Sequence, residues 1–138
     1  MATHRLSIEP DVAEIQRLLD WVESCCGDAG VGGDVPFKLS LALDEAVVNV
    51  INYAFADLPP PHRIEIELAI EPDRVTAVII DNGRAFDPLV VAPADPNIPL
   101  ADRKLGGLGI HLVRTMMDRV DYQRADGENR LRLEKARG

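Results

Sequence analysis

The sequence lacks several features that mark other classes of protein. It contains two cysteines, and because Cys25 and Cys26 are adjacent they form neither a spaced disulfide framework nor a CxxC metal pair. Basic residues are scarce, since 15 Lys and Arg stand against 23 Asp and Glu, giving a formal net charge of -8. This balance argues against direct binding of nucleic acid or of an anionic membrane, because both depend on clustered cations.

Long apolar runs are also missing. No stretch approaches the roughly 18 apolar residues of a membrane span, and residues 1–5 lead into no apolar segment of a secretory signal. We therefore expect a soluble protein, and the unpaired cysteines favour the reducing cytoplasm. At 138 residues, 46% of them apolar and 28% charged, the chain predicts a single globular domain over residues 1–138.

Hydrophobic periodicity predicts three elements in the first half of the chain. Alternation over residues 4–8 predicts a short strand. From Asp11, apolar residues recur at intervals of three and four and predict an amphipathic helix that ends in the glycine-rich stretch 27–33. A second helix is expected from an N-cap at Asp34 to about Phe55, before three consecutive prolines. The apolar positions of the first helix are Val12, Ile15, Leu18, Leu19 and Val22.

In the second half of the chain, a long irregular segment separates two predicted strands from a predicted helix and two further strands. Residues 63–70 and 75–80 read as two strands joined by a hairpin. Residues 84–105 contain four prolines and no sustained period, which we interpret as a lid. The remaining pattern predicts a helix over 107–117 and paired strands over 120–123 and 130–133. This order lacks the alternation of a doubly wound parallel sheet, so we expect an α+β fold: a two-layer α/β sandwich with a mixed sheet and helices on one face.

Polar residues interrupt the apolar second helix. Glu45 and Asn49 stand four residues apart, which puts both side chains on one helix face, and Asn52 extends the same polar side. An amide oxygen suits hard Mg²⁺ when phosphates supply the remaining charge, and a neighbouring carboxylate can accept a proton. The spacing therefore indicates a metal ligand, Asn49, and a general base, Glu45.

A second polar group follows an apolar strand. Asp81 ends the run 75–80 and precedes the turn signal Asn82-Gly83, which can hold a carboxylate at the mouth of a pocket. A carboxylate accepts from the exocyclic amine of adenine, whereas the carbonyl of guanine would place two acceptors face to face. Asp81 thus indicates a site that prefers ATP to GTP.

A glycine cluster opens the third predicted helix. Gly106, Gly107 and Gly109 let the backbone approach a polyphosphate closely at a helix N-terminus, which attracts anions. The Lys-Ser/Thr of a P-loop does not follow, and no GxGxxG follows a strand, so both of those nucleotide folds are disfavoured. Arg103 and Lys104 are basic side chains next to this cluster that can reach phosphate.

In their order and spacing, these motifs resemble those of the GHKL ATPases, most closely the bacterial anti-sigma-factor serine/threonine kinases of the RsbW and SpoIIAB type. Residues 41–49, Leu-Ala-Leu-Asp-Glu-Ala-Val-Val-Asn, are similar to the N box of that family. Residues 81–88, Asp-Asn-Gly-Arg-Ala-Phe-Asp-Pro, resemble the first G box, and residues 106–110, Gly-Gly-Leu-Gly-Ile, the second. The last strand, 129–133, also resembles its counterpart in the family.

The resemblance implies a Bergerat ATP-binding fold that uses Mg-ATP. It assigns Glu45 as general base, Asn49 to Mg²⁺, Asp81 to the adenine amine and the second G box to the phosphates. The implied substrate is a serine on a STAS-domain antagonist, the implied competing partner is a sigma factor, and a homodimer is a family expectation. The nucleotide-binding set is Asn49, Asn52, Asp81, Gly83, Ala85, Phe86, Arg103, Lys104, Gly106, Gly107, Leu108, Gly109 and Ile110.

Two other functions stay open at this point. One is a regulatory module that binds ATP or a protein partner without transferring phosphate. The other is a detached catalytic domain of a phosphorelay, although this chain has no separate dimerisation helices that carry a phosphoacceptor His. Acid-stable phosphoserine would separate the kinase from the phosphorelay domain.

Overall fold

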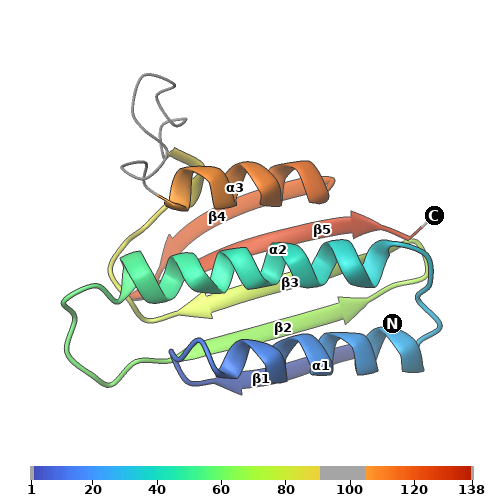
Figure 1. The fold of residues 1–138 in the computed structure, drawn as a ribbon, viewed down its shortest axis with the longest axis horizontal. Helices are drawn as coiled ribbons and strands as arrows, with labels where there is room; N and C mark the ends of the chain where they lie inside the picture. The colour runs from blue at the N-terminus through green and yellow to red at the C-terminus, as the bar shows by residue number, and fades with distance from the viewer. Residues whose placement is uncertain (1, 91–104, 138) are drawn as a thin grey trace.

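The computed structural model describes residues 2–90 and 105–137, and Figure 1 shows them as helices packed on one face of a sheet. No helix in these two ranges is long and apolar enough to cross a membrane. The strands are β1 (Ala2–Ile8), β2 (Ile64–Ile70), β3 (Arg74–Asp81), β4 (Arg119–Ala125) and β5 (Glu128–Ala136). The helices are α1 (Glu14–Asp28), α2 (Val35–Asn49), a π-helical turn (Val50–Ala54), a 3₁₀ turn (Pro88–Val90) and α3 (Leu105–Met116).

The sheet has the order β1-β2-β3-β5-β4, and all four strand pairings are antiparallel. The predicted α+β sandwich with helices on one face is confirmed, but the expectation of a mixed sheet was wrong. The strands β3 and β4 run in the same direction, as Figure 1 shows. A parallel pair would form if they were neighbours, but β5 folds back between them and pairs antiparallel with both.

The core lies between the helices and the inner face of the sheet. Alternate residues of the three central strands point into it, as the pattern predicted, and their side chains are shielded from solvent. Leu39, Leu43 and Val47 meet them from α2, while Leu18 and Val22 do so from α1. The buried strand residues include Ile64, Ile66, Leu68, Val75, Ala77, Ile79, Leu131 and Leu133.

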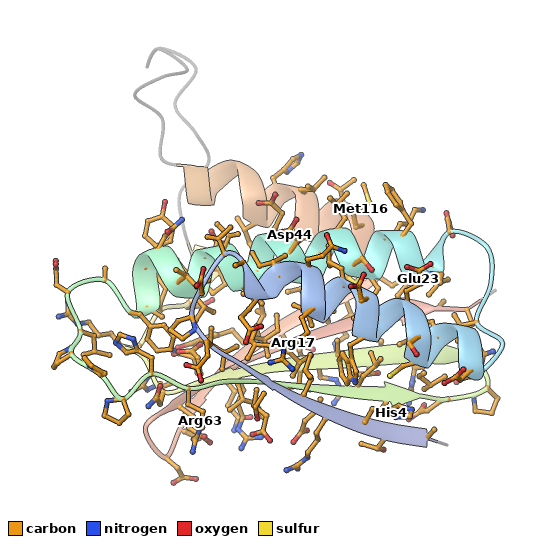
Figure 2. The ribbon with its side chains drawn as sticks, turned by 60° about the horizontal axis from the view of Figure 1, so that its bottom comes forward. His4, Arg17, Glu23, Asp44, Arg63 and Met116 are labelled. Carbon is orange, nitrogen blue, oxygen red and sulfur yellow. The ribbon has the colours of Figure 1, made fainter. Side chains whose placement is uncertain are left out.

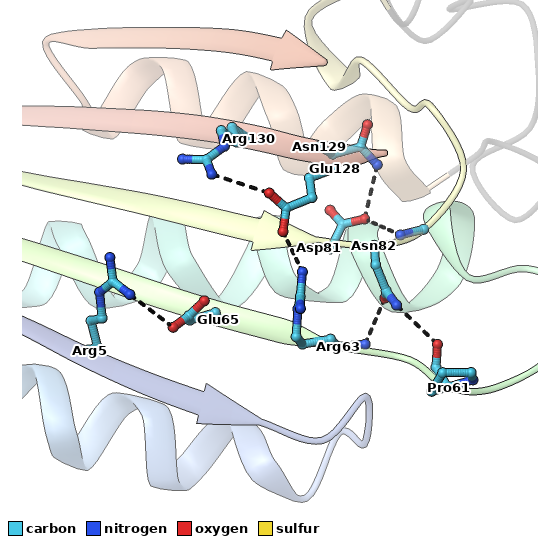
Figure 3. A network of polar contacts seen from close by, with 10 residues as sticks. Arg5, Pro61, Arg63, Glu65, Asp81, Asn82, Glu128, Asn129 and Arg130 are labelled. Carbon is cyan, nitrogen blue, oxygen red and sulfur yellow. Dashed lines mark hydrogen bonds and ion pairs between the residues drawn. The ribbon is translucent and has the colours of Figure 1, made fainter. Parts of the chain in front are cut away.

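The outer face of the sheet carries ion pairs in place of a second helix layer. Arg5 on β1 pairs with Glu67 on β2 at 2.7 Å, and Arg130 pairs with Glu128 on β5 at 3.2 Å. Figure 3 shows the Glu128 carboxylate between Arg130 and Arg63. Such exposed pairs contribute little to stability, so the helix-covered face supplies most of it.

The starts of the first two helices differ in detail from the sequence expectation. Residues 11–14 form a turn in which the Ala13 N–H donates to the Asp11 carboxylate at 2.9 Å, so α1 begins at Glu14 and Val12 is left 67% exposed. Asp34 occupies the N-cap position of α2, but its carboxylate pairs with Lys38 at 2.9 Å and makes no capping hydrogen bond.

The side chain of Arg17 on α1 is hydrogen-bonded to the edge strand β1. Arg17, labelled in Figure 2, donates to the backbone oxygen of Ser7 at 2.7 Å and pairs with Glu14 at 2.9 Å. The hydrogen bond from Arg17, together with one from the Glu9 backbone N–H, lowers the pKa of Glu14 to about 2. The contact fixes the path of the chain between its first strand and first helix.

Candidate functional site

Three elements end or begin at the same end of the sandwich. Figure 1 shows the end of α2, the arrowhead of β3 and the beginning of α3 together at this end. Register places Asp81, Asn129 and Arg124 side by side on β3, β5 and β4. This last row of the inner face therefore carries polar side chains where the preceding rows are apolar, which marks a site rather than a continuation of the core.

A small cavity lies between this polar row and α2. Its volume is about 20 Å³, enough for one water molecule, so a purine ring enters only if side chains around it move. Most of its lining is apolar, with a few convergent polar groups, as is usual for small-molecule sites. The lining residues are Ala46, Asn49, Val50, Ile79, Asp81, Phe86, Pro88, Tyr122, Asn129 and Leu131.

Asp81 is held as a hydrogen-bond acceptor. It is 2% exposed, and its Oδ1 accepts from the Gly83 backbone N–H at 2.9 Å and from Asn129 Nδ2 at 2.9 Å. Burial raises the pKa of this carboxyl above its usual value of 3.8, while the two hydrogen bonds act in the opposite direction. Because both hydrogen bonds from described residues end on Oδ1, Oδ2 is the oxygen left for a donor on a ligand.

Asn49 brings an unused hydrogen-bond donor to the cavity. It is 5% exposed and lines the cavity, yet its Nδ2 has no hydrogen-bond partner among the described residues. An unpartnered buried polar atom costs about 1–3 kcal/mol, which a ligand with an acceptor would recover. The carboxamide also offers the kind of oxygen that Mg²⁺ accepts beside substrate phosphates, so Asn49 fits the implied metal.

Glu45 lies one helical turn before Asn49 on α2 and is half-buried. Burial raises its pKa above the usual 4.5, and the adjacent Asp44 carboxylate adds to the effect. A raised pKa makes the carboxylate a better proton acceptor once it is ionised. Glu45 does not line the cavity. It lies on α2 one turn away from Asn49, which does line it.

The turn after β3 is joined tightly to the π-helical turn. A Cβ on Gly83 would lie 2.7 Å from the Ala54 backbone oxygen, so only glycine allows this approach. The Arg84 N–H donates to the same oxygen at 2.9 Å. The rings of Tyr53 and Phe86 stack with centroids 5.2 Å apart. These contacts set the distance between the end of α2 and the end of β3.

Asn82 ties the same turn to the segment before β2. Its Oδ1 accepts from the Arg63 backbone N–H at 2.7 Å, and its Nδ2 donates to the Pro61 oxygen at 3.1 Å (Figure 3). The predicted Asp-Asn-Gly turn is thus fixed on both sides, by Asn82 on one and by Asp81 on the other.

Several predicted site residues lie elsewhere or have no described side chain. Asn52 on the π-helical turn and Ala85 after β3 are exposed and do not line the cavity. Ile110 is 5% exposed and belongs to the core. The backbone of α3 begins at Leu105, two residues before the predicted start, and Gly106, Gly107, Leu108 and Gly109 form its first turns. Arg103 and Lys104 lie outside the described residues, as does most of the predicted lid.

Sequence reasoning did not assign three residues that the fold brings to the site: Tyr122, Arg124 and Asn129. A signal existed for Asn129, since alternation along 129–133 places it on the inner face with Leu131 and Leu133, where a polar residue is unusual. Tyr122 and Arg124 gave no such signal, because β4 is an edge strand whose pattern is mixed.

Comparison with known proteins agrees with this arrangement. Residues 8–135 match the model of the histidine kinase-like ATPase domain. The chain is 38% identical over 133 residues to the serine/threonine-protein kinase BtrW of Bordetella bronchiseptica, covering 95% of this chain and 92% of that protein. It is 27% identical over 129 residues to the serine-protein kinase RsbW of Listeria monocytogenes, covering 91% and 80%.

A solved structure supports the same fold. The crystal structure of the RsbU and RsbW domains of a Mycobacterium tuberculosis protein aligns with a TM-score of 0.69 and 12% identity. The alignment covers all of this chain and 34% of that chain. Together with the match over residues 8–135, this shows that the chain belongs to the histidine kinase-like ATPase family.

Proposed function

We propose that this protein is an ATP-dependent protein serine kinase that acts as an anti-sigma factor. Its substrate is a serine of a STAS-domain antagonist, its competing partner is a sigma factor, and its setting is the cytoplasm, with a homodimer as the expected assembly. The observation that carries the proposal is the buried pair Asp81 and Asn49. One cavity holds an oriented acceptor and an amide nitrogen that has no partner among the described residues.

The two buried residues have different tasks. Asp81 accepts a hydrogen bond from the exocyclic amine of adenine, and its bonds to Gly83 and Asn129 hold it in place for that contact. Guanine presents a carbonyl at the same position, and two facing acceptors in a buried site cost roughly 1–3 kcal/mol. The site therefore prefers ATP to GTP.

The phosphate end of the nucleotide lies toward Asn49 and the start of α3. Asn49 would ligate Mg²⁺, which neutralises phosphate charge when bound. The glycines Gly106, Gly107 and Gly109 bring backbone N–H groups of the first turns of α3 close to the phosphates. Arg103 and Lys104, which lie outside the described residues, are expected to add positive charge for the phosphates.

Glu45 serves as the base in the transfer step. It takes the proton of the serine hydroxyl while that oxygen forms a bond to the γ-phosphorus. The bond from the γ-phosphorus to the bridging oxygen of ADP breaks in the same step, so phosphoserine and ADP leave. Little covalent chemistry is asked of the enzyme, and positioning and charge neutralisation supply most of the acceleration.

The nucleotide assignment is tested by thermal unfolding with ATP, ADP and GTP, each with and without Mg²⁺. ATP at 100 times its dissociation constant should raise the free energy of unfolding by about 2.7 kcal/mol. The shift should depend on Mg²⁺, exceed that for GTP, and lose its metal dependence in Asn49→Ala. Gln16→Ala, an exposed change on α1, should keep the full response. No shift with any nucleotide would contradict ATP binding.

The base assignment is tested separately. Glu45→Ala should retain most ATP binding and lower phosphate transfer to a serine acceptor by roughly 10²- to 10⁴-fold. Glu23→Ala, an exposed carboxylate on α1 (Figure 2), is the matched control and should transfer normally. Full transfer by Glu45→Ala would remove the role of Glu45, and acid-labile phosphohistidine in place of phosphoserine would indicate a phosphorelay domain.

A further inference from the structure

Asn129 on β5 connects Asp81 to the turn that follows β3. It is 3% exposed, and its Nδ2 donates to Asp81 Oδ1 at 2.9 Å and to the Arg84 backbone oxygen at 2.6 Å. Both amide hydrogens are therefore used. As Figure 3 shows, the bond to Asp81 crosses from one strand to the next, so the carboxylate depends on a neighbour for its orientation.

The opposite end of the Asn129 carboxamide is fixed by donors. Its Oδ1 accepts from the Tyr122 hydroxyl, from Arg124 Nη1 at 3.2 Å and from the Phe86 N–H at 3.3 Å. A backbone N–H and a guanidinium can only donate, so the oxygen of Asn129 must face them and its nitrogen must face Asp81.

Tyr122 is suited to this task by its place in the fold. It comes from the edge strand β4, its ring packs against the core, and it lines the cavity that holds Asp81 and Asn49. Burial raises the pKa of its hydroxyl above the usual 10, so the group stays protonated and donates. Without that hydroxyl, the oxygen of Asn129 keeps the contacts from Arg124 at 3.2 Å and from the Phe86 N–H at 3.3 Å, and its amide turns more easily.

We propose that Tyr122 is a positioning residue that acts through Asn129 on Asp81 and thereby sets the preference for adenine over guanine. Both bonds that described residues donate to Asp81 end on Oδ1, so the orientation that Asn129 imposes decides where Oδ2 meets the base. This inference rests on the proposed function, in which Asp81 binds the adenine amine.

The test replaces the hydroxyl and keeps the ring. Tyr122→Phe should weaken ATP binding roughly 3- to 10-fold, the effect of one lost hydrogen bond, and should leave GTP binding nearly unchanged. Dissociation constants are measured by calorimetry with Mg²⁺, and melting temperatures verify that the variant folds. Gln123→Ala, the exposed next residue of β4, is the control and should match the parent chain for both nucleotides.

A second nucleotide separates positioning from a general change of the cavity. Purine riboside triphosphate lacks the exocyclic amine, so Tyr122→Phe should not alter its affinity if Tyr122 acts through Asp81. An equal loss for ATP and for purine riboside triphosphate would overturn the inference, as would an unchanged ratio of ATP to GTP affinity. If the parent chain itself does not discriminate ATP from GTP, the proposed function fails as well.

Discussion

At the scale of single residues, the candidate site contains two polar side chains at buried positions, where apolar side chains would make the folded chain more stable. Asp81 and Asn49 are nearly shielded from solvent, and neither forms an ion pair among the described residues. A polar group buried in this way is retained at a cost to stability. The cost is consistent with a binding role for both residues.

Asp81→Asn should separate this cost from the binding role. Because burial raises the pKa of Asp81 in the folded chain, its contribution to stability is full below the unfolded pKa and is lost as pH rises through the folded pKa. Without nucleotide, the variant should be at least as stable as the parent chain at pH 7, and the difference should shrink toward pH 4. ATP should bind it roughly 10- to 100-fold more weakly.

Urea unfolding between pH 4 and pH 8 checks the first part, and calorimetry checks the second. Thr76→Val provides a comparison, because Thr76 is also buried with an unpartnered hydroxyl but lies away from the cavity. A clear loss of stability in Asp81→Asn at pH 7 would contradict the assigned cost.

At the scale of elements, the π-helical turn and the turn after β3 act as one unit. Gly83 approaches Ala54 more closely than any other residue could, and the Arg84 N–H donates to Ala54. Since Asn49 precedes the π-helical turn and Asp81 precedes Gly83, this contact fixes the two buried site residues relative to each other.

Gly83→Ala should disrupt the contact between the π-helical turn and the turn after β3. The new methyl group would lie 2.7 Å from the Ala54 oxygen and 2.8 Å from its Cβ, so the backbone must shift at a cost of about 1–3 kcal/mol. ATP affinity should fall together with stability, as chemical denaturation and calorimetry would show. Gly32→Ala has no atom within 4 Å of its new Cβ and should change stability by less than about 0.5 kcal/mol. Equal behaviour of the two variants would refute the close contact.

At the scale of the whole molecule, stability comes from one core between three helices and one sheet face. The outer face is covered by charged side chains, so within residues 2–90 and 105–137 no second core supports the strands. The site lies at one end of this single core, where the last inner row of the sheet turns polar. A change deep in the core therefore acts on folding and not on the chemistry of the site.

Leu133→Ala tests this division. Leu133 on β5 is fully shielded from solvent, and its truncation should cost about 2–5 kcal/mol in the free energy of unfolding. Val12→Ala, at a position that is 67% exposed, should change it by less than about 0.5 kcal/mol. ATP affinity of the Leu133→Ala protein that remains folded should stay close to that of the parent chain. A loss of affinity larger than the loss of stability would show coupling between core and site.

Much of the fold followed from local patterns. Alternation predicted the strands over residues 4–8 and 63–70, intervals of three and four predicted the first two helices, and the order of polar groups pointed to Glu45, Asn49 and Asp81 as candidate site residues. These features depend on residues close in sequence, where periodicity and turn chemistry are direct physical signals. The start of α2 after Asp34 agrees with the prediction, whereas α1 begins at Glu14 and not at Asp11, because the Asp11 carboxylate accepts from the Ala13 N–H in a turn before the helix.

The sequence by itself determined the fold class, the buried strand faces and the motifs of a nucleotide site. Only the tertiary structure decided that β5 lies between β3 and β4, and hence that Asn129 stands beside Asp81. It also brought Tyr122 and Arg124 from an edge strand to the same carboxamide. Strand order depends on how the inner faces of the strands pack against the helices. This packing joins residues that are far apart in the sequence, so no local pattern predicts it.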